Sequence, residues 1–359
     1  MTNNPARMFD RWQGIVFALL AALLFGASTP MAKSLLPQVT PMLMAGLLYL
    51  GSGIGLGVYA LLRSFSKALG PREAALGRKD VPWLAAAIAA GGIVGPILLM
   101  WGLSATPASS ASLLLNLEGV LTALLAWFVF KENFDARIAS GMALIAAGGV
   151  CLSWMSRPEI GVPWGSLAIM GACLAWAIDN NLTRKVSTGD PVQIAMLKGL
   201  VAGSVNTGLA FTLGAKFPAL TSLLASGVVG FFGYGVSLTL FVLALRNIGT
   251  ARTGAYFSIA PFVGAAISIL LLGDKPTISF GVAAVLMAIG VWLHLTERHE
   301  HLHRHEPMEH EHLHYHDEHH QHTHGPDDPP GEPHTHRHRH EELVHSHPHY
   351  PDIHHRHTH

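Results

Sequence analysis

Ten long apolar runs alternate with short polar connections over the first 295 residues of this 359-residue chain. The runs are 18 to 26 residues long. A helix needs roughly 20 apolar residues to cross a bilayer core of about 30 Å. The pattern therefore predicts an all-α membrane protein with ten transmembrane helices. The predicted helices cover residues 14–35, 41–62, 81–104, 107–130, 136–154, 163–182, 191–213, 220–245, 251–272 and 278–295.

Lysine and arginine gather in alternate connections between these runs. Thirteen lie on the side that includes Arg7 and Arg11, and four lie on the other side. Such an excess marks the cytoplasmic side of a membrane protein, so we expect a multi-pass membrane protein with both termini in the cytoplasm. The opening MTNNPARMFDRWQG lacks a small-residue cleavage pattern, so we expect an uncleaved first span.

The two halves of the apolar region resemble each other. At a shift of 142 residues, the matched pairs are Glu132 with Asp274, Ala123 with Ala265, and Gly148 with Gly290; at a shift of 150, Pro41 meets Pro191. Each half holds five runs, an odd number, so the second half is expected to lie inverted in the membrane. Inverted repeats are typical of secondary transporters, whose substrate site lies near mid-membrane between the repeats. We expect one five-helix repeat at 14–155 and another at 163–295.

Each half closes with the same three features. A small-residue helix comes first, then an acidic residue just beyond it (Lys131-Glu132 and Gly273-Asp274), then a last helix containing glycine (GMALIAAGGVCL and GVAAVLMAIGVWL). This order resembles the EamA family of the drug/metabolite transporter superfamily. The resemblance implies a ten-helix inner-membrane carrier that exports small metabolites or drugs. It leaves two features unexplained: Gly119 stands where the second half has Pro261, and a histidine-rich tail follows.

The tail differs in amino-acid composition from the rest of the chain. Of 24 histidines, 23 lie between His299 and His359, mixed with acidic residues, arginine and proline. Such a segment has too few large apolar residues to bury a core, so we expect residues 297–359 to form a disordered cytoplasmic tail.

Alternating His-x-His favours divalent transition metals, because neutral imidazole suits Zn²⁺, Ni²⁺, Co²⁺ and Cu²⁺. Binding is expected to weaken as pH falls through about 6.5, since a protonated imidazole cannot ligate. The candidate ligands are His299, His301, His303, His305, His310, His312, His314, His316, His319, His320, His322, His324, His334, His336, His338 and His340.

Glu118 is the one charged residue within run 107–130. A carboxylate at that depth is costly unless it is paired, protonated or exposed to water, so such residues usually mark a solute or ion path. Glu118 is therefore a candidate coupling-proton site or cation ligand, or a buried carboxyl that only joins helices. Asn116 can reach it only if the helix is locally unwound, since residues i and i+2 face apart.

Further candidates come from the second half. Asp179 and Asn180 belong to a polar cluster in the sixth run, which is either part of the path or the solvated end of that helix; the first-half counterpart is the polar stretch around Ser28. Lys198 is expected to pair with Glu118 or Asp179, to bind an anionic substrate, or to extend toward the cytoplasmic face. Tyr256 opens the ninth run one turn after an arginine, so it lines the path or lies beside an interface anchor.

Together these features predict a secondary transporter, an exporter of a small metabolite or drug-like solute with a metal-binding tail. Two alternatives stay open: a Ni/Co/Zn efflux transporter loaded by the tail, and a membrane-anchored metal store or sensor without transport. No catalytic triad or phosphate-binding loop occurs, so an enzyme is not expected. We expect no required cofactor and no nucleic-acid partner; the partners are the bilayer, a small solute and metal ions, with a homodimer left open.

Overall fold

The computed structural model describes residues 5–65, 76–130, 136–154, 163–183, 185–186, 189–248, 253, 256–295, 300–305, 308–314, 334–340 and 343–348. The helices are α1 (Pro5–Leu35), α2 (Pro41–Phe65), α3 (Val81–Ala87), η2 (Ile88–Val94), α4 (Gly95–Ala105), α5 (Ala108–Leu114), α6 (Leu117–Phe130), α7 (Ala136–Trp154), α8 (Trp164–Thr183), α9 (Pro191–Thr212), α10 (Leu220–Gly230), η3 (Phe231–Val236), α11 (Ser237–Ile248), α13 (Ala260–Leu272) and α14 (Ile278–Leu295). The strands are β1 (Glu300–His305), β2 (Met308–His314), β3 (His334–His340) and β4 (Leu343–Pro348).

The membrane region is helical, as the apolar runs predicted. In the part of the chain that the structure describes, six helical stretches are long and apolar enough to cross a membrane: Trp12–Leu35, Pro41–Phe65, Val81–Ala105, Ala108–Leu125, Pro191–Thr212 and Leu220–Ala244. Three shorter apolar helices cover Ala139–Ser153, Ala260–Leu272 and Ile278–Leu293. The remaining predicted run contains α8. The prediction of an all-helical membrane body is confirmed, and the count of ten spans stays a prediction.

Proline and aspartate define where α9 begins. Pro191 occupies the first turn, where its missing N–H is not needed. The Asp190 carboxylate precedes it and accepts hydrogen bonds from the backbone N–H groups of Val192, at 2.8 Å, and Gln193, at 3.4 Å. It also pairs with Arg63 of α2 at 3.5 Å. The start of α9 is therefore capped and tied to α2.

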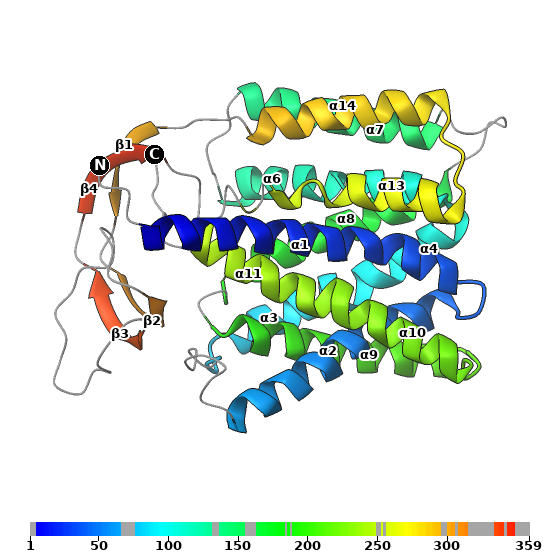
Figure 1. Cartoon of the computed structure of the whole chain (residues 1–359), viewed down its shortest axis with the longest axis horizontal. Coiled ribbons are helices and arrows are strands. Elements are labelled where there is room, and N and C mark those ends of the chain that lie inside the picture. The colour runs from blue at the N-terminus through cyan, green and yellow to red at the C-terminus, as the bar shows by residue number, and fades with distance from the viewer. Residues whose placement is uncertain are drawn as a thin grey trace.

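The most extensive packing between two described helices is that of α2 on α9, whose backbones cross at glycine positions. A Cβ added to Gly199 of α9 would lie 2.5 Å from the backbone nitrogen of Gly53 in α2, a distance that side chains do not tolerate. Small residues at such crossings let helix backbones approach closely in membranes. Figure 1 shows α2 and α9 at one edge of the bundle and α7 with α14 at the opposite edge.

Helix packing repeats between the two halves. Helix α1 of the first half packs on α11 and α13 of the second half, and α8 of the second half packs on α4 and α6 of the first. Among the described residues, each half has one π-helical segment, η2 in the predicted third span and η3 in the predicted eighth. The turn at residues 115–116 likewise has a counterpart at residues 258–259. The apolar pattern did not predict the π segments, because π and α helices present similar hydrophobic faces.

The described segments of the tail form paired strands. β1 pairs with β4 and β2 with β3, both antiparallel. These four strands were not predicted from the sequence, and the expectation for the tail as a whole, residues 297–359, stays a prediction. The physical reason for the strands is the His-x-His alternation, whose period of two residues matches a β-strand. Figure 1 shows the strands outside the helical bundle, beside the end where α1 begins.

Candidate transport site

Glu118 lies directly after an interruption in the fourth span. Helix α5 ends at Leu114 and α6 starts at Leu117. Backbone hydrogen bonds between residues three apart close the turn between them, such as the one from Asn116 N to Leu113 O at 3.1 Å. Glu118 therefore occupies the first turn of α6. A negative charge is favoured there because the first N–H groups of a helix are unpaired and the helix dipole is positive at this end.

The partner of Glu118 is Asn180 of α8. The Asn180 side-chain amide donates a hydrogen bond of 2.8 Å to Glu118 Oε1 and reaches Thr122 Oγ1 at 3.5 Å. Asn180 is exposed and Glu118 is partly exposed, so the pair is reachable from outside the packed core. This contact joins the fourth span of the first half to the sixth span, in the second half.

Asn116 serves a different contact. Its side-chain amide donates to Leu113 O at 3.0 Å and lies 3.9 Å from the sulfur of Met287, and Asn116 is buried. The local unwinding on which its contact with Glu118 depended is present. The amide nevertheless closes the turn instead of meeting the carboxylate.

Asp179 and Lys198 form an ion pair between α8 and α9. The ammonium of Lys198 lies 2.6 Å and 2.7 Å from the two carboxylate oxygens of Asp179. Thr183 completes the group, donating to Asp179 at 2.8 Å and accepting from Lys198 at 3.2 Å. The two charged side chains are only 8% and 12% exposed. Asp179 therefore belongs to the interior, and the alternative of a solvated helix end does not apply to it.

The π-helical segment η2 lies against this ion pair. A Cβ added to Gly91 would overlap the carboxylate of Asp179, so the position requires glycine. The Gly91 carbonyl accepts two hydrogen bonds, from the hydroxyl of Tyr49 at 2.8 Å and from the indole N–H of Trp176 at 2.9 Å. A π turn changes the hydrogen-bond spacing of a helix and often marks a functional site. Here it brings three helices together at one carbonyl.

The first half has an equivalent arrangement around Ser28. Gly233 of η3 packs directly on Ser28 of α1, as Gly91 of η2 packs on Asp179 of α8. Beside it, the ring of Tyr234 lies 5.4 Å from that of Tyr49, between centroids. The predicted correspondence between the Ser28 region and the Asp179 region therefore has a counterpart in packing.

Shared neighbours connect these groups. Asp179 and Asn180 are consecutive on α8, so the ion pair with Lys198 and the hydrogen bond to Glu118 start from adjacent residues. The hydroxyl of Tyr49 binds the carbonyl of Gly91, which lies against Asp179. The group thus combines two carboxylates, one ammonium and an aromatic hydroxyl.

Tyr256 lies elsewhere. It packs in a small cluster around Ala18 and Ala244, between α1 and α11. Arg252, its predicted neighbour, is outside the described residues. The structure therefore does not bring Tyr256 to the Glu118–Asn180 contact.

Some members of the site were not predicted from the sequence. Thr183 follows the end of the predicted sixth run and Tyr49 is one of several hydroxyl-bearing residues in the second run, so neither stands out in the sequence. Trp176 is a large residue inside the sixth run, and the structure buries it as a hydrogen-bond donor. A pair of glycines inside an apolar run, as at residues 91 and 92, was the one available sign of a close approach.

The candidate metal ligands of the tail were predicted to be histidines, whose side chains the structure does not describe. Among the side chains that the structure describes, no group of three or more His, Cys, Asp or Glu could hold a metal ion. The tail histidines are not in that set: their side chains lie outside the described part. His299, His316, His319, His320, His322 and His324 lie outside the described residues altogether.

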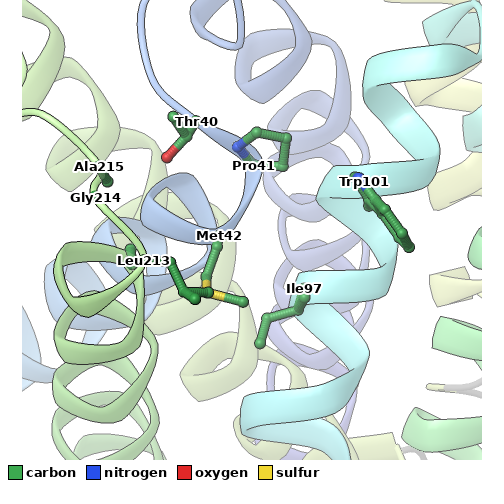
Figure 2. A pocket seen from close by; sticks show the side chains of 9 residues that line it. Thr40, Pro41, Met42, Ile97, Trp101, Leu213, Gly214 and Ala215 are labelled. Carbon is green, nitrogen blue, oxygen red and sulfur yellow. The ribbon is translucent and has the colours of Figure 1, made fainter.

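A separate apolar pocket lies at the rim of the bundle. It has a volume of about 360 Å³ and is formed by the start of α2, the middle of α4 and the end of α9. Figure 2 shows Met42 and Leu213 on one side and Ile97 on the other, with Trp101 beside them. None of the Glu118 group lines it.

Known proteins resemble the chain over most of its length. A family model described as the EamA-like transporter family matches residues 12–154 and again residues 163–296. An uncharacterized transporter of Methanothermobacter thermautotrophicus is 27% identical over 306 residues, covering 81% of this chain and 88% of that protein. The uncharacterized inner membrane transporter YedA of Escherichia coli K12 is 25% identical over 297 residues, covering 78% and 91%.

Two further comparisons extend this. A probable amino-acid metabolite efflux pump of Salmonella typhimurium is 25% identical over 208 residues, covering 53% of this chain and 68% of the pump. A crystal structure of a protein with 17% identity matches with a TM-score of 0.58, covering 78% of this chain and 94% of the other, which supports the fold alone. With the family model matched in both halves, the chain belongs to the EamA-like transporter family of the drug/metabolite transporter superfamily.

Proposed function

We propose that this protein is a secondary transporter that exports a small metabolite-type solute across the cytoplasmic membrane. Its relatives are transporters, and one is named as a probable efflux pump for amino-acid metabolites. Transporters of this kind bind their solute near mid-membrane between two repeats. We assign the repeats to residues 14–155 and 163–295, inverted relative to each other, with ten spans and both termini in the cytoplasm.

One observation carries the proposal: the hydrogen bond from Asn180 to Glu118 crosses between the two repeats. A solute or proton that binds the carboxylate competes directly with this contact. Because the contact joins α6 to α8, its loss changes how the repeats hold each other. The carboxylate is thus placed where solute binding and rearrangement of the repeats are coupled.

The ion pair between Asp179 and Lys198 forms one side of the proposed site. Asp179 and Asn180 are consecutive on α8, and they engage Lys198 of α9 and Glu118 of α6 at the same time. Lys198 balances the charge of Asp179 and Thr183 donates a hydrogen bond to it, so Asp179 is not the free ligand of the site. Glu118 accepts a hydrogen bond from the neutral amide of Asn180, and we take it as the carboxylate that is available to a solute. This favours solutes carrying an amine or another hydrogen-bond donor.

Solute flux in proteoliposomes tests the proposal. The full-length protein is reconstituted and assayed for exchange of radiolabelled amino-acid metabolites, the class that the relative's name suggests. We expect exchange above protein-free liposomes, lost in Glu118→Gln and kept in Asp190→Asn. The control removes an acidic charge at the start of α9, where Asn is also a good helix cap. If no solute of the panel exchanges, or if Glu118→Gln exchanges as fast as wild type, the assignment fails.

A further inference from the structure

The register of the tail strands places histidine opposite histidine. In the β2–β3 ladder the directly paired residues are His310 with His338, His312 with His336 and His314 with His334. In the β1–β4 ladder they are His301 with His347 and His303 with His345. Paired residues in an antiparallel ladder share a face, with Cβ atoms about 4.5–5.5 Å apart.

Because successive residues of a strand alternate between faces, the β2–β3 ladder has two unlike faces. One face collects the three histidine pairs together with Met308 and its partner His340. The other face pairs Glu309 with Arg339 and Glu311 with Arg337. Opposite charges directly across a ladder stabilise the pairing. A slip of one residue would place His310 against an arginine and mix the two faces, so the sequence itself specifies this register.

The two ladders share one register. The pairs Glu300 with Pro348 and Met308 with His340 both centre on position 324 of the chain. Histidine occupies odd positions from 301 to 305 and even positions from 310 to 314, and the other arm mirrors this change between positions 340 and 345. In a random histidine-rich sequence, a shift from odd to even positions in one arm would not be matched by the reverse shift in the other arm. The tail is therefore built as two arms that match each other.

We propose that the matched arms form divalent transition-metal sites, one on each ladder, each made from four histidines on one face. The four positions are His310, His312, His336 and His338 in the β2–β3 ladder, and His301, His303, His345 and His347 in the β1–β4 ladder. Neutral imidazoles suit Zn²⁺, Ni²⁺, Co²⁺ and Cu²⁺, and four ligands complete a tetrahedral zinc site. Neighbouring histidine positions along one strand are about 7 Å apart, and the partner strand supplies two more at directly opposite positions, so the four positions form one compact group on a face.

Metal binding and pairing of the arms are then one equilibrium. A two-stranded ladder is at best marginally stable in water, so it needs another source of stability. A metal that binds ligands from both arms supplies it, because the binding free energy of such a site is also folding free energy. The metal site does not depend on transport, and it stands or fails separately from the solute proposal.

An exchange of neighbouring residues tests the site without changing composition. In full-length protein, Glu311→His with His312→Glu moves one histidine to the opposite face of the ladder. The matched control, Glu318→His with His319→Glu, makes the same exchange outside the paired segments. We expect one of the two tight Zn²⁺ sites, measured by competition with a chromophoric chelator, to weaken by about tenfold or more in the first variant, while the site on the β1–β4 ladder keeps its affinity. The control should keep wild-type affinity. Equal effects of the two exchanges, or no effect of either, would show binding by composition alone.

A distance measurement tests the register. Spin labels on cysteines introduced at Leu313 and Thr335 occupy directly paired positions. Labels at Leu302 and Thr335 lie eleven residues out of register, about 36 Å apart along the ladder. The native cysteines are buried, so the introduced sites take the label. We expect Zn²⁺ to produce dipolar broadening for the first pair alone, reversed by a chelator. Broadening of both pairs, or of neither, would contradict the paired arms.

Discussion

The side-chain amide of Asn180 donates a hydrogen bond of 2.8 Å to the carboxylate of Glu118, and so joins α8 to the first turn of α6. The next residue toward the N-terminus, Asp179, binds Lys198 of α9. One turn of α8 therefore holds both neighbouring helices through charged groups. Charged groups at membrane depth are expensive and are usually kept for a solute or ion path.

Replacing Asn180 by alanine should slow transport without unfolding the protein. A hydrogen bond to a charged group is worth about 1.5–3 kcal/mol, so a loss of roughly tenfold or more in transport rate is expected. The control is Asn181→Ala, because Asn181 donates to Ala177 O in its own helix at 2.8 Å and reaches α6 only through the longer bond to Thr122 O, at 3.4 Å, without touching Glu118. Exchange rates in proteoliposomes provide the readout. An unchanged rate in Asn180→Ala, or equal losses in both variants, would argue against a role for the inter-repeat contact.

The Asp179–Lys198 pair should behave as a buried ion pair. Lys198→Met leaves the Asp179 carboxylate buried without its ammonium partner, which costs roughly 3–5 kcal/mol in such pairs. Adding Asp179→Asn removes the uncompensated charge, so the double variant should recover most of the lost stability. The melting temperature of the purified protein in detergent measures both. A double variant as unstable as Lys198→Met would show that the pair is not coupled in this way.

Gly91→Ala should disrupt the site through packing. The new Cβ overlaps the Asp179 carboxylate, so either η2 or α8 must move, and overpacking of this kind costs roughly 1–3 kcal/mol. Gly208→Ala is the matched control, since nothing lies within 4 Å of a Cβ at that position of α9. We expect the control to melt at or above the wild-type temperature, because alanine favours helix over glycine by up to about 1 kcal/mol. Similar melting temperatures for the two variants would rule out the close approach at Gly91.

Two charges fix the connection between α4 and α5. The ammonium of Lys33 donates to the carbonyls of Ser104, at 3.2 Å, and Thr106, at 3.0 Å, where α4 ends. The carboxylate of Asp274 accepts from Ser109 N at 2.9 Å, where α5 begins. Each charge is opposite in sign to the helix end that it meets, a favourable arrangement.

From this geometry, Lys33→Met should lower stability by about 1–2 kcal/mol, the range for a charge at a partly buried helix end. Lys216→Met, in the connection between α9 and α10, is the control and should change little. Melting curves of both variants in the same detergent check this. Equal shifts would mean that the effect comes from loss of positive charge in general.

The sequence was sufficient for the helical body and insufficient for its interior contacts. Runs of 18 to 26 apolar residues left little choice but helices. The interruption beside Asn116 was named only as a condition for its contact with Glu118, because run 107–130 was predicted as one continuous helix. The partner of Lys198 was left open, because pairing and extension to the surface give the same pattern in one helix. Asn180 was recognised as polar, yet its bond to Glu118 depends on how α6 and α8 pack, which no single span encodes.

The dependence of solute exchange on pH, compared between wild type and Glu118→Gln, tests the central claim most directly. Both proteins are reconstituted at equal density, and the exchange rate of one transported solute is followed across pH 5 to pH 9. If Glu118 is the carboxylate that binds proton or solute, the wild-type rate varies with pH, and the Glu118→Gln rate is low and flat. A Glu118→Gln protein that folds and follows the wild-type curve at the wild-type rate would remove Glu118 from the transport mechanism.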